Sequence, residues 1–206
     1  MYAGADNVRV ISGEAKGRPL KAVPGNTTRP TTDKVKEAMF SIIGPYFDGD
    51  RVLDLFAGTG GLGIEALSRG AGEAVFVDAN VKSIEVIRQN LDATRFGERS
   101  EVYRMDARKA IAYLVRKGTA FDLLFLDPPY ATKDCDLLLQ ELASKGLVAD
   151  KALAVVEHDS KFAYDEAFGG FTLKRHVKYG EIALSVYRYD AGRNDAETSS
   201  DEGGER

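Results

Sequence analysis

The sequence predicts an α/β protein built on a seven-stranded, mostly parallel sheet that ends in an antiparallel hairpin. After residue 50, short and nearly continuous apolar segments alternate with longer amphipathic segments. Strands of that kind are buried on both faces, so the segments between them are expected to be helices covering a parallel sheet. The last two apolar segments lie too close together to hold a helix, which makes them a hairpin. The 206 residues, 44% of them hydrophobic, suffice for one core of ordinary size.

The predicted elements follow one another without an internal repeat. Strands are expected at residues 51–55, 74–78, 101–105, 121–127 and 152–157, and then at 171–177 and 181–189. Helices are expected at about 62–69, 81–93, 107–117 and 134–145. Tyr179 and Gly180 fall between the last two strands and supply the hairpin turn.

A small extension, residues 8–48, precedes this sheet. Val8–Ile11 alternates in polarity and, together with Leu20–Val23, predicts a β-hairpin or two short strands. A helix should open after residues 29–33, with Thr32 or Asp33 capping its first turn. Apolar side chains then recur at helical spacing, at Val35, Met39, Ile42 and Ile43.

Charge divides the chain into a basic arm and an acidic tail. The formal net charge is −4, and residues 190–206 account for it with six acids and two arginines. Residues 8–36 carry seven basic and two acidic side chains, a net charge of +5. Residues 1–7 and 190–206 hold few apolar side chains and are predicted to be disordered, which leaves 49–189 as the main domain. A basic arm suits a polyanionic partner, although a solvated surface explains it equally well.

The composition narrows the class of protein. The longest apolar segments are far too short to cross a bilayer, and the N-terminus lacks the pattern of a secretory signal. Cys135 is the one cysteine and His158 and His176 are the only histidines, which is too few for a zinc or cluster site of the usual spacing. We therefore expect a cytoplasmic protein without a metal or a membrane partner.

The junction after the first main strand holds the sequence DLFAGTGGLG, residues 54–63. Gly58, Gly60 and Gly63 satisfy G-x-G-x-x-G between a strand and a helix, where bare backbone lets a nucleoside approach, and Asp78 at the next strand tip suits ribose hydroxyls. A tight turn alone would also explain the glycines. Asp54 lies where it would repel a pyrophosphate and attract a cation, so the loop favours S-adenosylmethionine over a dinucleotide.

The fourth main strand ends in Asp127-Pro128-Pro129-Tyr130. The carboxyl ends of neighbouring parallel strands lie at the same edge of a sheet, so this tetrad should face the crevice beside the glycine loop. The prolines remove N–H donors and leave carbonyl acceptors, Asp127 adds a carboxylate, and Tyr130 offers a flat face for stacking. That set suits an exocyclic amine on a planar base, whereas the alternative is a plain rigid loop.

Three motifs in this order carry a resemblance to a known family. They are R-P-T-T-D at residues 29–33, F-A-G-T-G at 56–60 and D-P-P-Y at 127–130. Over about residues 8–189 the chain resembles the bacterial 16S rRNA guanine-N2 methyltransferases, which have a Rossmann-like class I methyltransferase fold. The resemblance makes residues 49–189 the methyltransferase domain. It implies direct transfer of a methyl group from S-adenosylmethionine, without a covalent enzyme intermediate and with S-adenosylhomocysteine as product.

The resemblance also implies roles for particular residues. Asp127 and the Pro128 carbonyl would hold the amine, with Pro129 and Tyr130 completing the catalytic set. Cofactor contacts are implied for Thr31, Thr32, Asp54, Phe56, Gly58, Gly60, Asp78, Ala79, Asp106 and Ala107. Asp106 equally suits a helix N-cap. Contacts to the rRNA backbone are implied for Arg9, Lys16, Arg18, Lys21 and Arg29. The expected partner is 16S rRNA or a small-subunit particle, bound by a monomer.

Other functions remain open at this point. An enzyme of the same fold acting on DNA adenine N6 or a protein glutamine amide fits the tetrad, although no insertion of the size of a DNA target-recognition domain is present. An NAD-dependent oxidoreductase would leave Asp54 and the tetrad unexplained. A non-catalytic RNA-binding protein of this fold would not need both loops intact.

Overall fold

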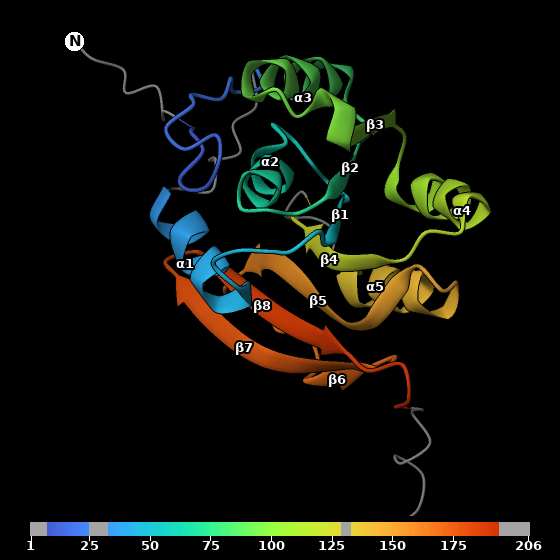
Figure 1. The fold of residues 1–206 in the computed structure, drawn as a ribbon. Helices are drawn as coiled ribbons and strands as arrows, with labels where there is room; N and C mark the ends of the chain where they lie inside the picture. The colour runs from blue at the N-terminus through green and yellow to red at the C-terminus, as the bar shows by residue number, and fades with distance from the viewer. Residues whose placement is uncertain (1–7, 25–32, 129–132, 194–206) are drawn as a thin grey trace, which may run out of the picture.

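The computed structural model describes residues 8–24, 33–128 and 133–193 of the chain. One eight-stranded sheet runs through the molecule in the order β3-β2-β1-β4-β5-β8-β7-β6 (Figure 1). Strands β3, β2, β1, β4 and β5 pair in parallel, and β5, β8, β7 and β6 pair antiparallel. This is the predicted Rossmann-like methyltransferase architecture, with its C-terminal hairpin formed by β7 and β8.

The elements lie close to their predicted positions. The helices are α1 (Asp33–Ile43), α2 (Gly61–Ser68), α3 (Val81–Thr94), α4 (Ala107–Lys117) and α5 (Cys135–Ser144), with a 3₁₀ turn η1 (Gly97–Arg99). The strands are β1 (Arg51–Asp54), β2 (Glu73–Asp78), β3 (Ser100–Arg104), β4 (Phe121–Leu126), β5 (Val148–Asp159), β6 (Ala167–Phe168), β7 (Phe171–Tyr179) and β8 (Ile182–Tyr189). The sequence prediction omitted β6, a two-residue strand at the sheet edge, because so short a segment carries no periodicity.

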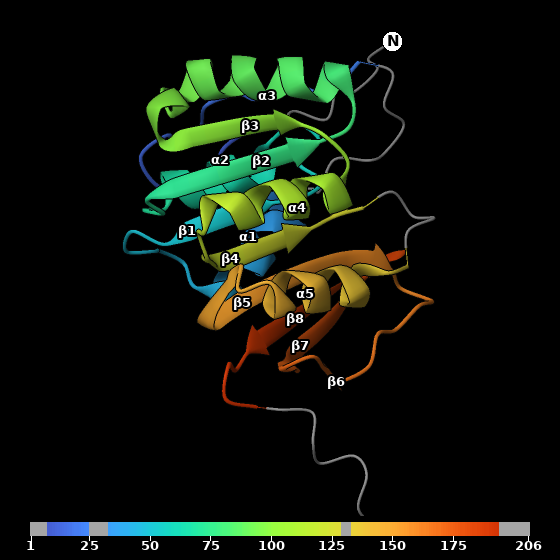
Figure 2. The ribbon, with the colours of Figure 1, turned by 90° about the vertical axis from the view of Figure 1, so that its right-hand side faces the viewer.

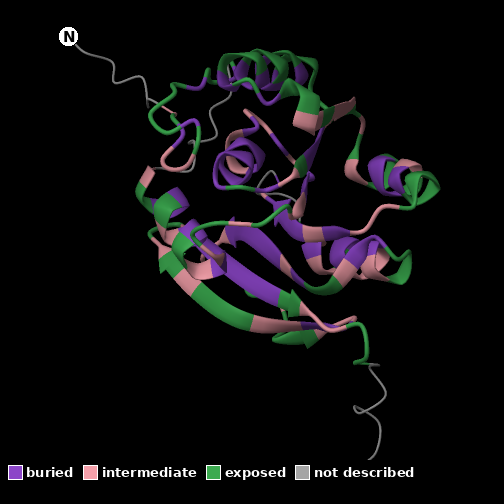
Figure 3. Cartoon of the chain, viewed as in Figure 1, coloured by how far each residue is buried: buried purple, intermediate pink, exposed green. Residues whose placement is uncertain are grey.

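Alternating side chains divide the core between the two faces of the sheet. Along β1, Val52 belongs to a cluster shared with α1, α2 and α3, whereas Leu53 belongs to a cluster shared with α4 and α5. Figure 2 shows α4 and α5 in front of the sheet with α1 and α2 behind it. The strands in the middle of the sheet are buried along most of their length (Figure 3), as expected of parallel strands covered on both sides. No helix in the described ranges is long and apolar enough to span a membrane.

The N-terminal extension departs from the predicted hairpin. Residues 8–20 form a loop closed by a single antiparallel bridge between Arg9 and Pro19 instead of two strands. The backbone between them bonds to α2, since Ala15 N–H donates to the Ser68 hydroxyl and Glu14 N–H to the Ser68 carbonyl. The extension therefore bonds partly across its own loop, with Val10 N–H donating to the Arg18 carbonyl and Leu20 N–H to the Val8 carbonyl, and partly to the main domain, with which it also shares a hydrophobic cluster.

Candidate active site

Three acidic side chains meet at the carboxyl edge of the sheet. In the parallel register Asp54 of β1 pairs with Phe125 of β4, and Phe125 pairs with Val155 of β5. Asp127 and Glu157 each follow two residues later, so they occupy matching positions on neighbouring strands. Because Phe125 and Val155 both face the α1–α3 side, strand alternation sends both acids toward that same side. The topology thus gathers acids that are distant in sequence at one site.

The glycine loop wraps around Asp78 at the tip of β2. One carboxylate oxygen of Asp78 accepts from Gly58 N–H at 2.9 Å, and the other accepts from Asn80 N–H at 2.7 Å. Gly58 has a positive φ of 54°, and a side chain added there would meet open space. The loop therefore presents bare backbone on an open side, next to a carboxylate whose remaining lone pairs suit ribose hydroxyls.

The other two glycines serve packing. A Cβ at Gly60 would lie 3.3–3.4 Å from Ile64, Ile87 and Phe76, and one at Gly63 would lie 2.4 Å from the Phe76 ring. The space beside Gly60 is thus occupied by the core, so a larger side chain there would press against Ile64, Ile87 and Phe76.

Two backbone N–H groups at the start of α2 already have side-chain acceptors, one at the end of β1 and one in the glycine loop. Gly63 N–H donates to Asp54 Oδ2 at 3.1 Å, and Gly61 N–H donates to Thr59 Oγ1 at 3.2 Å. A pyrophosphate at this helix start would have to displace these contacts and approach the Asp54 carboxylate. The geometry disfavours a dinucleotide and leaves a cationic, phosphate-free nucleoside as the better match.

Burial disfavours the charged form of two of the acids. Asp54 is only 2% exposed, and burial, with a further contribution from Asp78, raises its pKa to about 7. Burial likewise raises the pKa of Asp127 well above its usual range, and the nearby charges of Glu157 and Asp54 add to that effect. A positively charged ligand or reaction centre would relieve this repulsion.

Asp127 and Pro128 line a small pocket whose other wall comes from the end of β5 and the loop after it. That wall contains three aromatic side chains, and the ring centroids of Phe162 and Tyr164 lie 4.7 Å apart at 83°. The full lining is Asp127, Pro128, Lys133, Glu157, His158, Asp159, Phe162 and Tyr164. Acceptors, an ammonium group and flat rings thus surround one opening, a combination that suits a polar aromatic guest.

Of the remaining predicted cofactor residues, the structure describes Phe56, Ala79, Asp106 and Ala107, which lie in or next to the loops that follow β1, β2 and β3. Asp106 caps α4, accepting from Lys109 N–H at 3.0 Å, and it is exposed, so the N-cap interpretation describes what the fold uses it for. Ala79 is exposed, whereas Phe56 and Ala107 are half-buried. Thr31, Thr32, Pro129 and Tyr130 lie outside the described residues.

The predicted RNA-contacting residues lie on the surface of the N-terminal extension. The four that the structure describes, Arg9, Lys16, Arg18 and Lys21, are all exposed, and Arg29 lies outside the described residues. Arg9 pairs with Asp33 at 2.7 Å, so part of its charge is neutralised locally. Buried Asn90 ties the extension to the glycine loop, since its amide donates to the carbonyls of Lys21 and Thr59 at 3.1 and 2.9 Å. The basic arm is therefore held next to the candidate cofactor site.

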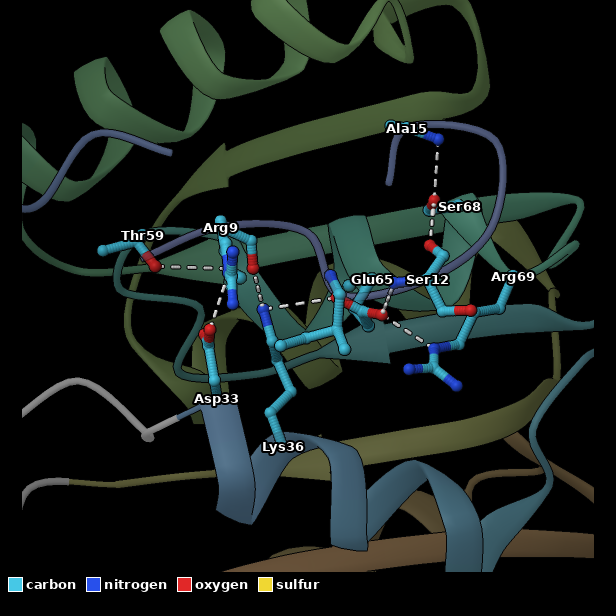
Figure 4. A network of polar contacts seen from close by, with 12 residues as sticks. Arg9, Ser12, Ala15, Asp33, Lys36, Thr59, Glu65, Ser68 and Arg69 are labelled. Carbon is cyan, nitrogen blue, oxygen red and sulfur yellow. Dashed lines mark hydrogen bonds and ion pairs between the residues drawn. The ribbon is translucent and has the colours of Figure 1, made fainter. Parts of the chain in front are cut away.

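A buried ionic network joins the extension, α1 and α2, and the sequence analysis did not foresee it (Figure 4). Glu65 of α2, with no exposed surface, binds Lys36 of α1 at 3.2 Å and Arg69 at 2.7 Å. It also accepts from the N–H groups of Ile11 and Ser12 at 2.8 and 3.0 Å. Burial lowers the pKa of Lys36, while Glu65 acts against that shift. Lys36 also bonds to the Arg9 carbonyl, so one carboxylate organises three segments.

The sequence analysis also missed the pocket wall formed by β5. Glu157 and His158 sit at the end of an apolar strand, and nothing in their spacing marks them as site residues. Among the described residues, no group of three or more histidine, cysteine, aspartate or glutamate side chains is arranged to hold a metal ion. Cys135 is buried, and burial raises the pKa of its thiol to about 11, which does not favour a nucleophile.

Comparison with known proteins agrees with this geometry. A family model described as Conserved hypothetical protein 95 matches residues 8–188. The "Putative rRNA methyltransferase YlbH" of Bacillus subtilis is 45% identical over 181 residues, covering 88% of this chain and 98% of that protein. The "Ribosomal RNA small subunit methyltransferase D" of Escherichia coli is 31% identical over 197 residues, covering 95% and 98%.

Solved structures give the same match at the level of the fold. One described as "Putative methyltransferase yhhF from Escherichia coli" has a TM-score of 0.78 and 31% identity, covering 90% of this chain and 99% of that one. An RNA methyltransferase from Salinibacter ruber, solved in complex with S-adenosyl-L-homocysteine, has a TM-score of 0.61 at 15% identity, covering 81% and 97%. The second similarity concerns the fold alone.

Proposed function

Since the chain belongs to the family described as Conserved hypothetical protein 95, we propose that it methylates the exocyclic N2 amine of a guanine in 16S rRNA, using S-adenosylmethionine. Two of the relatives bear the names "Putative rRNA methyltransferase YlbH" and "Ribosomal RNA small subunit methyltransferase D", which supports an rRNA substrate. The observation that carries the proposal is the placement of Asp127 and Pro128 in a pocket beside the glycine loop and Asp54. The substrate is the rRNA or the small-subunit particle, and the enzyme is a cytoplasmic monomer.

The loop residues fit S-adenosylmethionine. Gly58 leaves open space where the ligand would approach, Asp78 suits the ribose hydroxyls, and Asp54 complements a cation. Asp106 and Ala107 lie beyond β3, where an adenine would be held. When bound, the cofactor supplies an electrophilic methyl group on a positively charged sulfur. Asp54 and Asp127 add favourable electrostatics around that charge without the anionic repulsion a dinucleotide would meet.

Asp127 and Pro128 prepare the amine. The lone pair of guanine N2 is delocalised into the ring, which makes this nitrogen a poor nucleophile. The Asp127 carboxylate and the Pro128 carbonyl would accept its two hydrogens and turn the lone pair toward the methyl donor. As positive charge develops on nitrogen, Asp127 stabilises it, because a preorganised charge in a partly buried site acts strongly. The methylated amine then loses one proton, which passes to Asp127 or water.

Methyl transfer to small subunits isolated from cells that lack the gene tests this proposal. The product nucleoside is identified by mass spectrometry, and we expect N2-methylguanosine in 16S rRNA. An N6-methyladenosine or a methylated glutamine would replace the proposed acceptor with another. In single-turnover assays Asp127→Ala should slow transfer by on the order of 10²-fold or more, and Asp127→Asn, which keeps an oxygen acceptor but no charge, should fall in between. Transfer at the wild-type rate by Asp127→Ala would exclude the mechanism.

A further inference from the structure

We propose that Glu157 selects guanine as the base to be methylated, by accepting the hydrogen on ring nitrogen N1. This inference rests on the proposed function and deepens it, because it assigns the discrimination between bases to the pocket wall opposite Asp127. The sequence motifs that identify the cofactor and amine sites do not include Glu157. Its role follows from where the fold places it.

Glu157 and Asp127 stand side by side at the edge of the sheet. The register of β4 and β5 pairs Phe125 with Val155 and Leu126 with Val156, so the next residues of the two strands are neighbours. Neighbouring strands lie about 4.8 Å apart, so side chains from equivalent positions on the two strands can converge on adjacent groups of one base. Both side chains line the same pocket. A base whose exocyclic amine meets Asp127 therefore brings its adjoining ring nitrogen toward Glu157.

The chemical pattern of the lining matches the edge of guanine. That edge presents the N2 amine, the N1 hydrogen and the O6 acceptor in a row. The pocket offers the carboxylates of Asp127 and Glu157, which accept, and the ammonium group of Lys133, which donates. Adenine and cytosine carry a lone pair on the ring nitrogen beside their amine. A carboxylate facing that lone pair would be repelled, so Glu157 both binds guanine and disfavours the other amino bases.

The rest of the pocket suits a base turned out of its stack. Phe162 and Tyr164 present ring faces and edges beside the carboxylates, and the Lys133 ammonium lies 5.5 Å from the centre of the Phe162 ring. Enzymes that modify bases read the flipped base by its Watson–Crick edge and by stacking on aromatic side chains. Glu157 is only 8% exposed, so a hydrogen bond made to it is shielded from water and discriminates strongly. Burial, and after it the charge of Glu157, raise the pKa of Asp127, and the repulsion between the two carboxylates is relieved when N–H donors enter.

The test compares guanine with 2-aminopurine, which keeps the exocyclic amine but has a lone pair in place of the N1 hydrogen and no oxygen at C6, so the Glu157→Gln variant is needed to assign the N1 contribution. Once the modified position is mapped, small subunits are reconstituted with either base at that position. We expect wild-type enzyme to favour guanine by at least about 100-fold in kcat/KM, since sites built around a substrate N–H reject analogues that lack it. In Glu157→Gln the side-chain amide can donate to the lone pair. The preference should then drop below about 10-fold, with faster transfer to 2-aminopurine than in wild type.

Two controls separate this inference from folding and from the proposed function. Glu73→Gln changes an acid outside the pocket, which pairs with Arg51 at 3.1 Å at the start of β2, and should leave the preference unchanged. Calorimetry with S-adenosylmethionine verifies that each variant keeps the cofactor site. Equal transfer to both bases by wild-type enzyme, or an unchanged guanine preference in Glu157→Gln, would overturn the role of Glu157. Failure of wild type to methylate the guanine-containing particle would instead remove the proposed function itself.

Discussion

Asp54 is a buried acid whose ionisation costs the fold stability. Its pKa is raised from 3.8 to about 7, so the folded chain holds a proton that the unfolded chain releases. The contribution of Asp54 to the free energy of unfolding therefore falls as pH rises from about 4 to about 7 and stays at its lowest value above that range. Asp54→Asn stays neutral and keeps an oxygen for Gly63 N–H. At pH 8 the variant should exceed wild type in unfolding free energy by on the order of 4 kcal/mol, since the pKa rises by roughly three units and each unit corresponds to about 1.4 kcal/mol.

Urea unfolding of both proteins without cofactor at pH 4, 6 and 8 measures this effect. The difference should be small at pH 4 and largest at pH 8. A difference that stays the same at all three values would mean that Asp54 is ionised throughout. The same variant should bind S-adenosylmethionine more weakly at pH 8, because the carboxylate that complements the cation is gone.

Gly58 and Gly60 look alike in the sequence motif but should respond differently to alanine. A methyl group at Gly58 meets open space on the side where we place the cofactor, whereas one at Gly60 lies against Ile64, Ile87 and Phe76. Both positions have positive φ, so each substitution strains the backbone by about 1 kcal/mol or more. Gly58→Ala should lose cofactor affinity by about 10-fold or more with a modest drop in Tm, whereas Gly60→Ala should mainly lose Tm. Calorimetry and thermal unfolding distinguish the two, and unchanged affinity in Gly58→Ala would place the cofactor elsewhere.

For single residues, the sequence predicts functional side chains in the loops better than those that lie within helices and strands. Asp54 and Asp127 could be found because each adjoins a glycine or proline motif at a strand end, and Asp78 because it ends the strand that follows the glycine motif. Glu65 and Glu157 could not be found, because a single acid in a helix or strand pattern resembles a solvated side chain. Their significance arises only when distant segments supply their neighbours, as α1 and the N-terminal loop do for Glu65.

The network around Glu65 fastens the extension and α1 to α2. Removing its carboxylate leaves the charges of Lys36 and Arg69 buried without compensation and two backbone N–H groups without their acceptor. Breaking a buried ion pair in this way typically costs about 3–5 kcal/mol, so Glu65→Ala should lower the unfolding free energy by that amount. Glu73→Ala removes an exposed pair with Arg51 and should cost at most about 1 kcal/mol. Equal losses in the two variants, measured by urea unfolding, would contradict a special role for the network.

The elements differ in how well the sequence predicts them. Strands β1 to β5 and helices α2 to α5 were predicted well because burial sets hydrophobic periodicity. The strands are buried within the sheet, and the helices pack against it. The N-terminal hairpin was predicted from alternation alone, yet its backbone groups bond to Ser68 and Glu65 of α2. Alternation can show that one side of a segment is buried, but it cannot show whether a neighbouring strand or a helix supplies the hydrogen bonds.

On the scale of the whole molecule, the sheet order brings the acidic side chains together, and the extension places basic side chains near them. Strands β1, β4 and β5 are neighbours although more than sixty residues separate β1 from β4 in the chain. The extension reaches the glycine loop through Asn90. An acidic pocket suited to amine and cation chemistry thus lies close to a basic surface suited to phosphates. The net charge of −4 does not reveal this arrangement, because the positive charge of residues 8–36 is offset by acidic residues elsewhere in the chain.

The basic extension should supply most of the affinity for RNA. Lys16 and Arg18 are exposed there, and charge reversal at both (Lys16→Glu and Arg18→Glu) would replace attraction to phosphates with repulsion. We expect weaker binding to small-subunit rRNA and a salt dependence of log Kd whose slope falls by roughly one for each phosphate that the variant no longer binds. Affinity for S-adenosylmethionine should stay the same, because neither side chain belongs to the cofactor loop. Charge reversal at two exposed basic residues near the C-terminal ends of α4 and α5, Arg116 and Lys145, provides the matched control. It should change the slope little. If both double variants lower the slope equally, the extension is no specific RNA surface and its charge acts only through the total field of the protein.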